Sequence, residues 1–188
     1  TKRSPPSPPS DPGPAGPLSQ GVGRLVDVRT VTIALCAFVL MEPFTALAHR
    51  LVMHGAGIAL HRSHHRRVRP GESPRRWEAN DAFPVMFAAV VMIGFAVGFN
   101  VSGFDSLVPI GIGITAYGAA YALVHDVYIH RRLPLFGDRT LPVFERLAVA
   151  HRRHHDRNGA PYGMLAPLPV RGGRGRNGST PSHDPADA

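Results

Sequence analysis

Three long apolar runs restrict the fold of this chain more than any other feature of its sequence. The runs cover residues 31–48, 82–99 and 107–124, and Glu42 is the only charged residue inside them. As an α-helix, each run would extend ~27 Å, which is just enough to cross the hydrocarbon core of a bilayer. Core helices of a soluble bundle are the alternative, but runs this uniform leave too little polar surface for one. We therefore predict an all-α, multi-pass membrane helical bundle.

The two ends of the chain differ from this apolar centre. Residues 1–23 are rich in proline, and residues 171–188 are rich in glycine and arginine. Neither stretch can bury enough apolar surface to offset the entropy lost on ordering. We expect disordered tails there and one membrane domain over residues 24–170. Residues 133–136 and 141–150 are apolar but too short to cross, and we expect interfacial helices there.

Basic residues indicate which ends of the spans face the cytoplasm. Residues 49–81 carry seven arginines and residues 125–188 carry ten, whereas residues 100–106 carry neither lysine nor arginine. By the positive-inside rule, the second and third runs form a hairpin with an external turn and cytoplasmic arginine-rich ends. We expect the bacterial inner membrane as the location. The basic residues before the first run fit less well, because three spans place them outside, and the sequence leaves this conflict open.

The net charge of +8 suits either nucleic acid or an anionic membrane surface. The arginines gather at the ends of the apolar runs, where anionic lipid attracts them, and no basic motif interleaved with aromatic residues accompanies them. We therefore expect membrane lipid as a partner and no nucleic acid. Cys36 is the only cysteine, which excludes an intramolecular disulfide, a thiolate zinc site and an iron–sulfur cluster.

Ten of the eleven histidines form a pattern that occurs twice, once in each arginine-rich segment. Each segment reads H-x4-H followed by H-x2-H-H. The first copy is formed by His49, His54, His61, His64 and His65, and the second by His125, His130, His151, His154 and His155. The eleventh, His183, lies in the C-terminal tail and is assigned no role.

Helical geometry explains part of this spacing. Residues at i, i+3 and i+4 share one face of a helix, so H-x2-H-H presents three imidazoles together. Residues five apart lie ~140° apart on a regular α-helix. They converge only at a helix end, at a bulge or around an enclosed metal pair. The first and third apolar runs lead directly into His49 and His125, so both H-x4-H boxes are expected where a spanning helix leaves the bilayer.

Ten imidazoles repeated at one membrane face predict a metal site. Burying them without partners would be costly, and exposing them to water would require no such spacing. Imidazole suits zinc, copper, iron and nickel, so the ligand type alone does not select the metal. Their number exceeds the ligands of one tetrahedral zinc site and favours two ions. The chain contains no Glu-x-x-His, which argues against the carboxylate di-iron design of ferritin-like bundles.

These boxes and their surroundings resemble the membrane fatty acid hydroxylase and sterol desaturase superfamily, and within it the bacterial β-carotene hydroxylase branch. The matching stretches are MEPFTALAHRLVMHG, HRSHH, WEANDAFPVMFA, TAYGAAYALVHDVYIHRRLP and RLAVAHRRHH. Together they cover most of residues 41–155. The MHG after the first box, the NDAF segment and the HD that opens the third box favour the carotenoid branch over its relatives.

The resemblance implies a di-iron centre that activates O2, with all ten box histidines as iron ligands, and the distribution of arginines places this centre on the cytoplasmic side. It also implies hydroxylation of β-ionone rings at C3, which converts β-carotene through β-cryptoxanthin into zeaxanthin. Electrons would come from a ferredoxin or a similar carrier. A sterol or fatty acyl hydroxylase of the same superfamily is the nearest alternative. A non-catalytic membrane metal-binding or transport protein is a second one, although transport favours histidines along the spans and these flank them.

Four further polar residues are candidates for supporting the metal ligands. Asp126 adjoins His125 and could accept its ring N–H, or it could pair with nearby arginines. Asn80 and Asp81 could cap the second span, which we favour, or face the metal site. Glu42 is an ionisable group inside a span, either protonated or paired with a buried ligand.

Arginines of the first cytoplasmic segment are candidates for docking the electron donor. They are Arg66, Arg67, Arg75 and Arg76. Their positive charge could steer an acidic ferredoxin. Anchoring to lipid headgroups explains them equally well.

Overall fold

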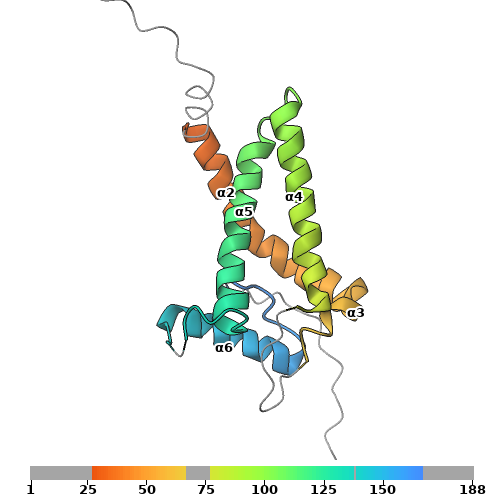
Figure 1. Ribbon diagram of the computed structural model, residues 1–188, viewed down its shortest axis with the longest axis vertical. Helices are drawn as coiled ribbons and strands as arrows, with labels where there is room; N and C mark the ends of the chain where they lie inside the picture. The colour runs from red at the N-terminus through yellow and green to blue at the C-terminus, as the bar shows by residue number, and fades with distance from the viewer. Residues whose placement is uncertain (1–26, 67–76, 138, 167–188) are drawn as a thin grey trace, which may run out of the picture.

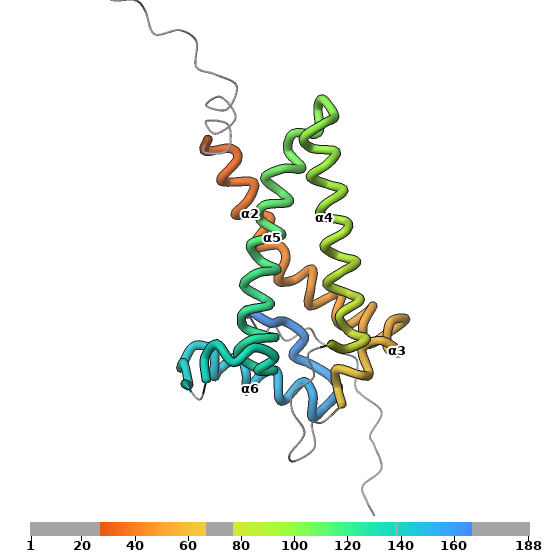
Figure 2. The backbone as a smooth tube through the Cα atoms, in the orientation of Figure 1, coloured from red at the N-terminus to blue at the C-terminus, as the bar shows by residue number. Residues whose placement is uncertain are grey.

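A computed structural model describes residues 27–66, 77–137 and 139–166. Every regular element in this described part is helical, which confirms the predicted all-α class. Three long helices form a column: α2 (Val28–Ala48), α4 (Ala82–Asn100) and α5 (Leu107–Ala122). Two further helices, α3 (Ile58–His61) and α6 (Pro142–Arg157), lie across the lower end of the column (Figures 1 and 2). The two predicted tails, residues 1–23 and 171–188, lie outside the described residues. So do residues 24–26, 67–76, 138 and 167–170 of the predicted membrane domain.

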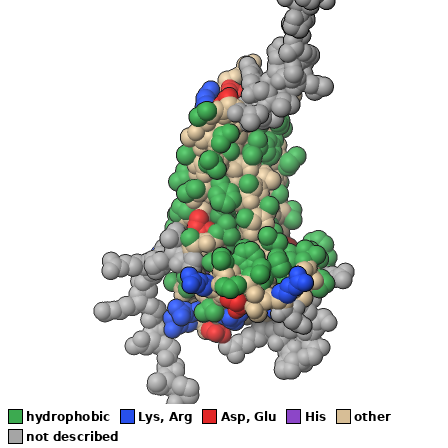
Figure 3. Space-filling view, turned by 90° about the vertical axis from the view of Figure 1, so that its left-hand side faces the viewer, with side chains coloured by type: hydrophobic (Ala, Val, Ile, Leu, Met, Phe, Trp, Pro, Cys, Tyr) green, Lys and Arg blue, Asp and Glu red, His purple; other side chains and the backbone are tan. Residues whose placement is uncertain are grey.

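The column contains three helical segments that are long and apolar enough to cross a membrane, as predicted. With their helical extensions they are Val28–Ala56, Ala79–Asn100 and Leu107–Ile129. The first begins three residues earlier than the apolar run, because the Asp27 side chain accepts a hydrogen bond from Thr30 N at 2.8 Å and caps the helix. Figure 3 shows apolar side chains along the column and most of the visible basic ones near its lower end. Lipid is the solvent that such a surface fits.

The spanning helices approach one another at glycines. A Cβ atom built on Gly113 of α5 would lie 2.2 Å from the carbonyl oxygen of Ala34 in α2. On the same helix, a Cβ atom on Gly111 would lie 2.8 Å from the Phe95 ring of α4. Small residues allow this close packing, which replaces the hydrophobic driving force that helices lack in lipid. Helix α5 is therefore the centre of the column.

The start of α2 lies at the end of the column opposite the histidine boxes. Arg29 Nη2 donates a hydrogen bond to Ser106 Oγ at 3.2 Å, and Ser106 belongs to the turn that joins α4 to α5. Figure 1 shows this turn at the top and α3 and α6 at the bottom. The first apolar run thus extends along the full column, and the described residues contain three candidate spans, the odd number that the basic N-terminal residues made doubtful.

The two short apolar stretches behave differently. Residues 141–150 fall within α6, as expected, although this helix continues to Arg157. Residues 133–136 are not helical, so the prediction of a helix there is wrong. Pro134 explains the difference, because proline lacks an N–H donor and pushes the preceding Leu133 away from the helical region.

Candidate metal centre

Both H-x4-H boxes begin on a π-helix that continues a spanning helix, and His130 is the residue that caps the second one. Helix α2 runs into η1 (His49–Ala56), and α5 runs into η3 (Leu123–Ile129). In these segments backbone bonds join residues five apart, as in His130 N to His125 O at 2.9 Å. A π turn therefore brings histidines five apart onto one face. The rings of His125 and His130 lie 4.6 Å apart between centroids. The sequence allowed a helix end, a bulge or an enclosed metal pair as the cause of this convergence. The structure shows π-helical backbone, which is the bulge.

The two H-x2-H-H boxes have different backbones. The second lies entirely within α6, as the helical spacing predicts. The first begins at His61, the last residue of α3, and continues through a turn in which His64 N donates to His61 O at 3.0 Å. This turn keeps the imidazoles together without a regular helix.

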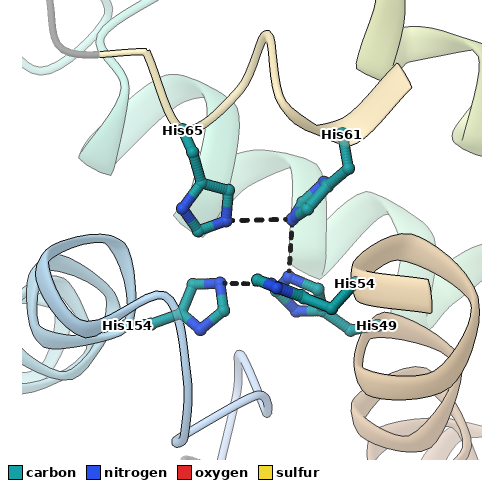
Figure 4. Close-up of side chains that lie close together, drawn as sticks. All are labelled: His49, His54, His61, His65 and His154. Carbon is teal, nitrogen blue, oxygen red and sulfur yellow. Dashed lines mark hydrogen bonds between the residues drawn. The ribbon is translucent and has the colours of Figure 1, made fainter. Parts of the chain in front are cut away.

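The histidines form two groups at the base of the column. Nitrogen atoms within each group lie within 4.8 Å of one another. Cluster A consists of His49, His54, His61, His65 and His154 (Figure 4). Cluster B consists of His64, His125, His130 and His151. The tenth histidine, His155, adjoins cluster B, because its Nε2 lies 2.8 Å from His151 Nε2 and 3.2 Å from His64 Nε2.

The sequence repeat reappears as a two-fold relation between the clusters. Each H-x4-H box stays in one cluster, whereas each H-x2-H-H box divides between both. The middle histidine of each divided box, His64 or His154, crosses to the cluster of the other repeat. Replacing every histidine of cluster A by its counterpart in the other repeat gives cluster B with His155. Each group of five therefore needs both halves of the chain.

In cluster A the outer ring nitrogens donate to neutral acceptors. His49 Nδ1 donates to the carbonyl oxygen of Tyr162 at 3.1 Å. His154 Nδ1 donates to the carbonyl oxygen of Gly159 at 2.6 Å. His61 Nδ1 lies 2.7 Å from Asn80 Oδ1. A proton on Nδ1 leaves the Nε2 lone pair free to face the centre of the cluster.

In cluster B the corresponding acceptors are carboxylates. His125 Nδ1 lies 3.0 Å from Asp126 Oδ1. His64 Nδ1 lies 3.3 Å from Glu78 Oε2. These contacts again place the proton on Nδ1 and turn Nε2 inward.

The inward nitrogens are spaced as a metal ion requires. His49 Nε2 lies 3.0 Å from His61 Nε2, and His64 Nε2 lies 3.1 Å from His125 Nε2. With the protons held on Nδ1, neither pair can form a hydrogen bond, and two lone pairs face each other. A shared cation removes this repulsion, since nitrogens bound at about 2.1 Å lie about 3 Å apart at a right angle. The residues present therefore fit a metal in each cluster.

Electrostatics also favour the neutral, metal-binding form of these rings. Burial lowers the pKa of His64 and His151 far below the usual value of 6.5. Repulsion from the positive charge of neighbouring imidazoles is a second, smaller cause. The same causes lower the pKa of His65 to about 3 and that of His155 to about 2. Burial lowers the pKa of His154 to about 4. These imidazoles are thus neutral at pH 7, as metal coordination requires.

The structure distributes the four supporting candidates over different roles. Asp126 and Asn80 face His125 and His61, as described above. Among the described residues, Asp81 makes no hydrogen bond to a histidine. Its Oδ2 accepts from Glu78 N at 2.9 Å in the turn before α4, and its Oδ1 accepts from Arg132 at 2.6 Å. His183 lies outside the described residues.

Glu42 is buried in α2, where it holds the segment that follows α6. Its carboxylate accepts hydrogen bonds from the backbone N–H groups of Met164, Leu165 and Ala166 at 2.8–3.0 Å. It also accepts one from the Tyr117 hydroxyl at 2.6 Å. Its link to the histidines is indirect, because the anchored segment includes the Tyr162 carbonyl that accepts from His49.

Sequence reasoning missed four groups that support the histidines. Glu78 and Arg132 were visible as charged residues two positions from Asn80 and His130, but nothing in their spacing separated them from surface charges. The other two are the backbone carbonyls of Gly159 and Tyr162, and a carbonyl acceptor leaves no signal in residue type.

Fold and site together define a helical membrane protein with a histidine cage suited to metal ions. Residues 34–169 match the family model described as fatty acid hydroxylase, and the chain belongs to that family. No solved structure matches the chain.

The chain is similar to proteins of bacteria and plants whose names are those of β-carotene hydroxylases. The chain is 41% identical over 125 residues to the β-carotene hydroxylase of Pseudescherichia vulneris, covering 65% of this chain and 66% of the relative. It is 41% identical over 142 residues to the chloroplastic β-carotene 3-hydroxylase of an Oncidium hybrid cultivar, covering 72% and 44%. It is 37% identical over 143 residues to β-carotene hydroxylase 1 of Capsicum annuum, covering 72% and 43%. The chain thus spans less than half the length of these plant relatives.

Proposed function

We propose that this chain is a di-iron membrane monooxygenase that hydroxylates carotenoid β-ionone rings at C3, converting β-carotene through β-cryptoxanthin to zeaxanthin. One observation carries the proposal: ten box histidines gather at one end of three spans in two groups, with inward nitrogens spaced for metal ions. The names of the relatives, β-carotene hydroxylase and β-carotene 3-hydroxylase, support the substrate and the position.

Cluster A would hold one iron, and cluster B with His155 would hold the other. Imidazole also suits zinc and copper, so the choice of iron rests on the hydroxylation chemistry of the relatives. When bound, the iron pair supplies the activation of O2 that oxidation of an unactivated C–H bond requires. The chain's own task is to keep the imidazoles oriented, with each Nδ1 proton held by an outer acceptor where one is present.

The position of the clusters favours a substrate that arrives from lipid. Both H-x4-H boxes directly continue spanning helices, which supports a position for the histidines where the column meets the membrane surface. We propose that one ring enters laterally between helices while the polyene stays in the bilayer. The helices then hold the ring edge beside the metal site, where small displacements change the rate strongly.

The electron donor is proposed to be a ferredoxin or a similar acidic carrier on the cytoplasmic side of the inner membrane. A cavity of about 240 Å³ lies beside cluster B, lined by Ile129, His130, His151, Arg152, His155 and Asp156. Its Arg152 side chain is 59% exposed, with Nη2 at 3.6 Å from Glu145 Oε2, and brings a guanidinium next to the histidines. Among the four arginines proposed from the sequence, Arg66 is exposed, and the other three lie outside the described residues.

Expression in a host that accumulates β-carotene tests this proposal. Chromatography of the extracted pigments should show β-cryptoxanthin and zeaxanthin. The His154→Ala variant, expressed to the same level, serves as the inactive control. An unchanged pigment profile from iron-loaded protein would contradict the carotenoid assignment, and new hydroxylated sterols or acyl chains would favour the alternative substrates.

A further inference from the structure

The two clusters match in their ligands but differ in the charge of the groups behind them. In cluster A the acceptors for His49, His61 and His154 are two backbone carbonyls and one amide, all neutral. In cluster B the acceptors for His64 and His125 are the carboxylates of Glu78 and Asp126. The two-fold relation of the histidines is therefore broken by their surroundings.

Arg132 joins the carboxylates of cluster B into one network. Its Nη2 lies 3.2 Å from Glu78 Oε2, at ion-pair distance. Its Nη1 donates to Asp81 Oδ1 at 2.6 Å, and its Nε lies 3.5 Å from Asp126 Oδ1. Arg132 thus positions both carboxylates that face histidines. Among the described residues, this network combines three carboxylates with one guanidinium, which leaves an excess of negative charge within it.

This charge is screened only in part. The side chains of Glu78 and Arg132 are 13% and 12% exposed, and that of Asp126 is 33% exposed. A carboxylate that accepts the Nδ1 proton makes the imidazole a stronger donor through Nε2. A nearby negative charge also stabilises the more positive of two metal oxidation states, more strongly at low dielectric.

We propose that Glu78 and Asp126, held by Arg132, make cluster B the site that is oxidised first, while cluster A keeps its iron reduced. This inference rests on the proposed function, since it requires one iron in each cluster. It assigns different electronic roles to two sites whose ligands are alike. Glu78, Asp126 and Arg132 act as positioning residues, because none of them supplies an inward nitrogen.

Stepwise oxidation of the full chain in lipid nanodiscs tests the proposal. Protein loaded anaerobically with 57Fe2+ is titrated with ferricyanide, each equivalent of which takes one electron from one Fe2+. Mössbauer spectra should show one iron site converting to Fe3+ before the other, with about a tenfold preference. Two irons that oxidise together in the wild-type chain would overturn the inference.

A pair of opposite charge substitutions identifies which cluster is oxidised first. Glu78→Gln removes a negative charge behind cluster B and should reduce the preference. Asn80→Asp places a negative charge behind His61 of cluster A and should also reduce the preference. In this variant, however, the altered Mössbauer spectrum should be that of the iron that oxidises second. If Asn80→Asp instead alters the iron that oxidises first, the assignment is overturned.

Two further measurements separate this inference from its foundation. Asp126→Asn repeats the charge removal at His125, so a Glu78→Gln chain that fails to bind iron does not end the test. Arg132→Lys keeps one positive charge and should retain part of the preference, whereas Arg132→Gln should change the spectrum of the first-oxidised iron. Fewer than two irons per wild-type chain would contradict the proposed function itself.

Discussion

In the column of spanning helices, Leu35, Val90 and Phe99 are each more than 60% exposed, at 61%, 62% and 68%. At the base of the column, His61 and His154 are only 2% and 1% exposed. The column therefore turns apolar side chains outward, and the base turns polar ones inward. The two regions are thus stabilised by different interactions. Lipid satisfies the outside of the column, so its helices need only close packing, whereas the base needs a partner for every imidazole.

Removal of one crossing histidine should have the largest effect, because it breaks the base and leaves the column intact. His64→Ala removes an inward nitrogen of cluster B, and we expect turnover to fall more than about 100-fold with a loss of bound iron. Pigment analysis and iron determination on the same preparation measure both. Val90→Leu, on the exposed face of α4, is the matched control and should behave as the wild type. Full activity in His64→Ala would contradict the ligand assignment.

Acid should release iron from the base before it disturbs the column. The folded-state pKa of His154, about 4, lies below its ordinary value of 6.5, so the unfolded chain takes up the proton first. This stabilising contribution is complete above pH 6.5 and is lost as the pH falls toward 4. In the folded chain this imidazole takes up a proton only near pH 4, so iron retention in detergent should fall as the pH drops through about 4, while far-ultraviolet circular dichroism stays helical. Iron that remains bound well below this pH would count against imidazole ligands.

A methyl group at the tightest point of the column should weaken it without touching the histidines. Gly113→Ala places a Cβ atom against the Ala34 carbonyl oxygen, and such overpacking costs about 1–3 kcal/mol. We expect a lower temperature of thermal unfolding in detergent. Gly94→Ala makes the same change in α4, where no neighbouring atom lies within 4 Å of the added carbon, and should be nearly neutral. Equal effects of both substitutions would contradict close packing between α2 and α5.

The smallest effects should come from the group that joins the two regions. Tyr117→Phe removes one of four hydrogen bonds to Glu42 and should cost about 1 kcal/mol of stability. Glu42→Gln should cost more, because its amide NH2 faces backbone donors that it cannot accept from. Thermal unfolding of both variants measures this order. A larger loss in Tyr117→Phe would show that the hydroxyl, rather than the backbone contacts, anchors the segment.

The column could be predicted from the sequence because hydropathy and length alone determine a span. The bounds moved by only a few residues, as at Val28, where the Asp27 cap adds a turn. The base could be predicted only in part. The i, i+5 spacing was compatible with a helix end, a bulge or a metal pair, and only the backbone shows that η1 and η3 are π-helices.

The partition of the histidines could not be predicted, because it depends on tertiary contacts. Nothing local sends His64 and His154 to the cluster of the opposite repeat. Likewise, the pairing of Glu42 with residues 164–166 joins segments more than 120 positions apart. Helical periodicity indicates which side chains share a face, but it does not show which distant face they meet.

The most direct test of the account is the iron content of the purified, catalytically active chain, measured together with its cluster variants. The wild type should bind two irons per chain. His54→Ala in cluster A and His130→Ala in cluster B should each lower this number to about one. One iron per active wild-type chain would contradict two separate histidine-bound sites. Equal iron content in the wild type and both variants would contradict them as well.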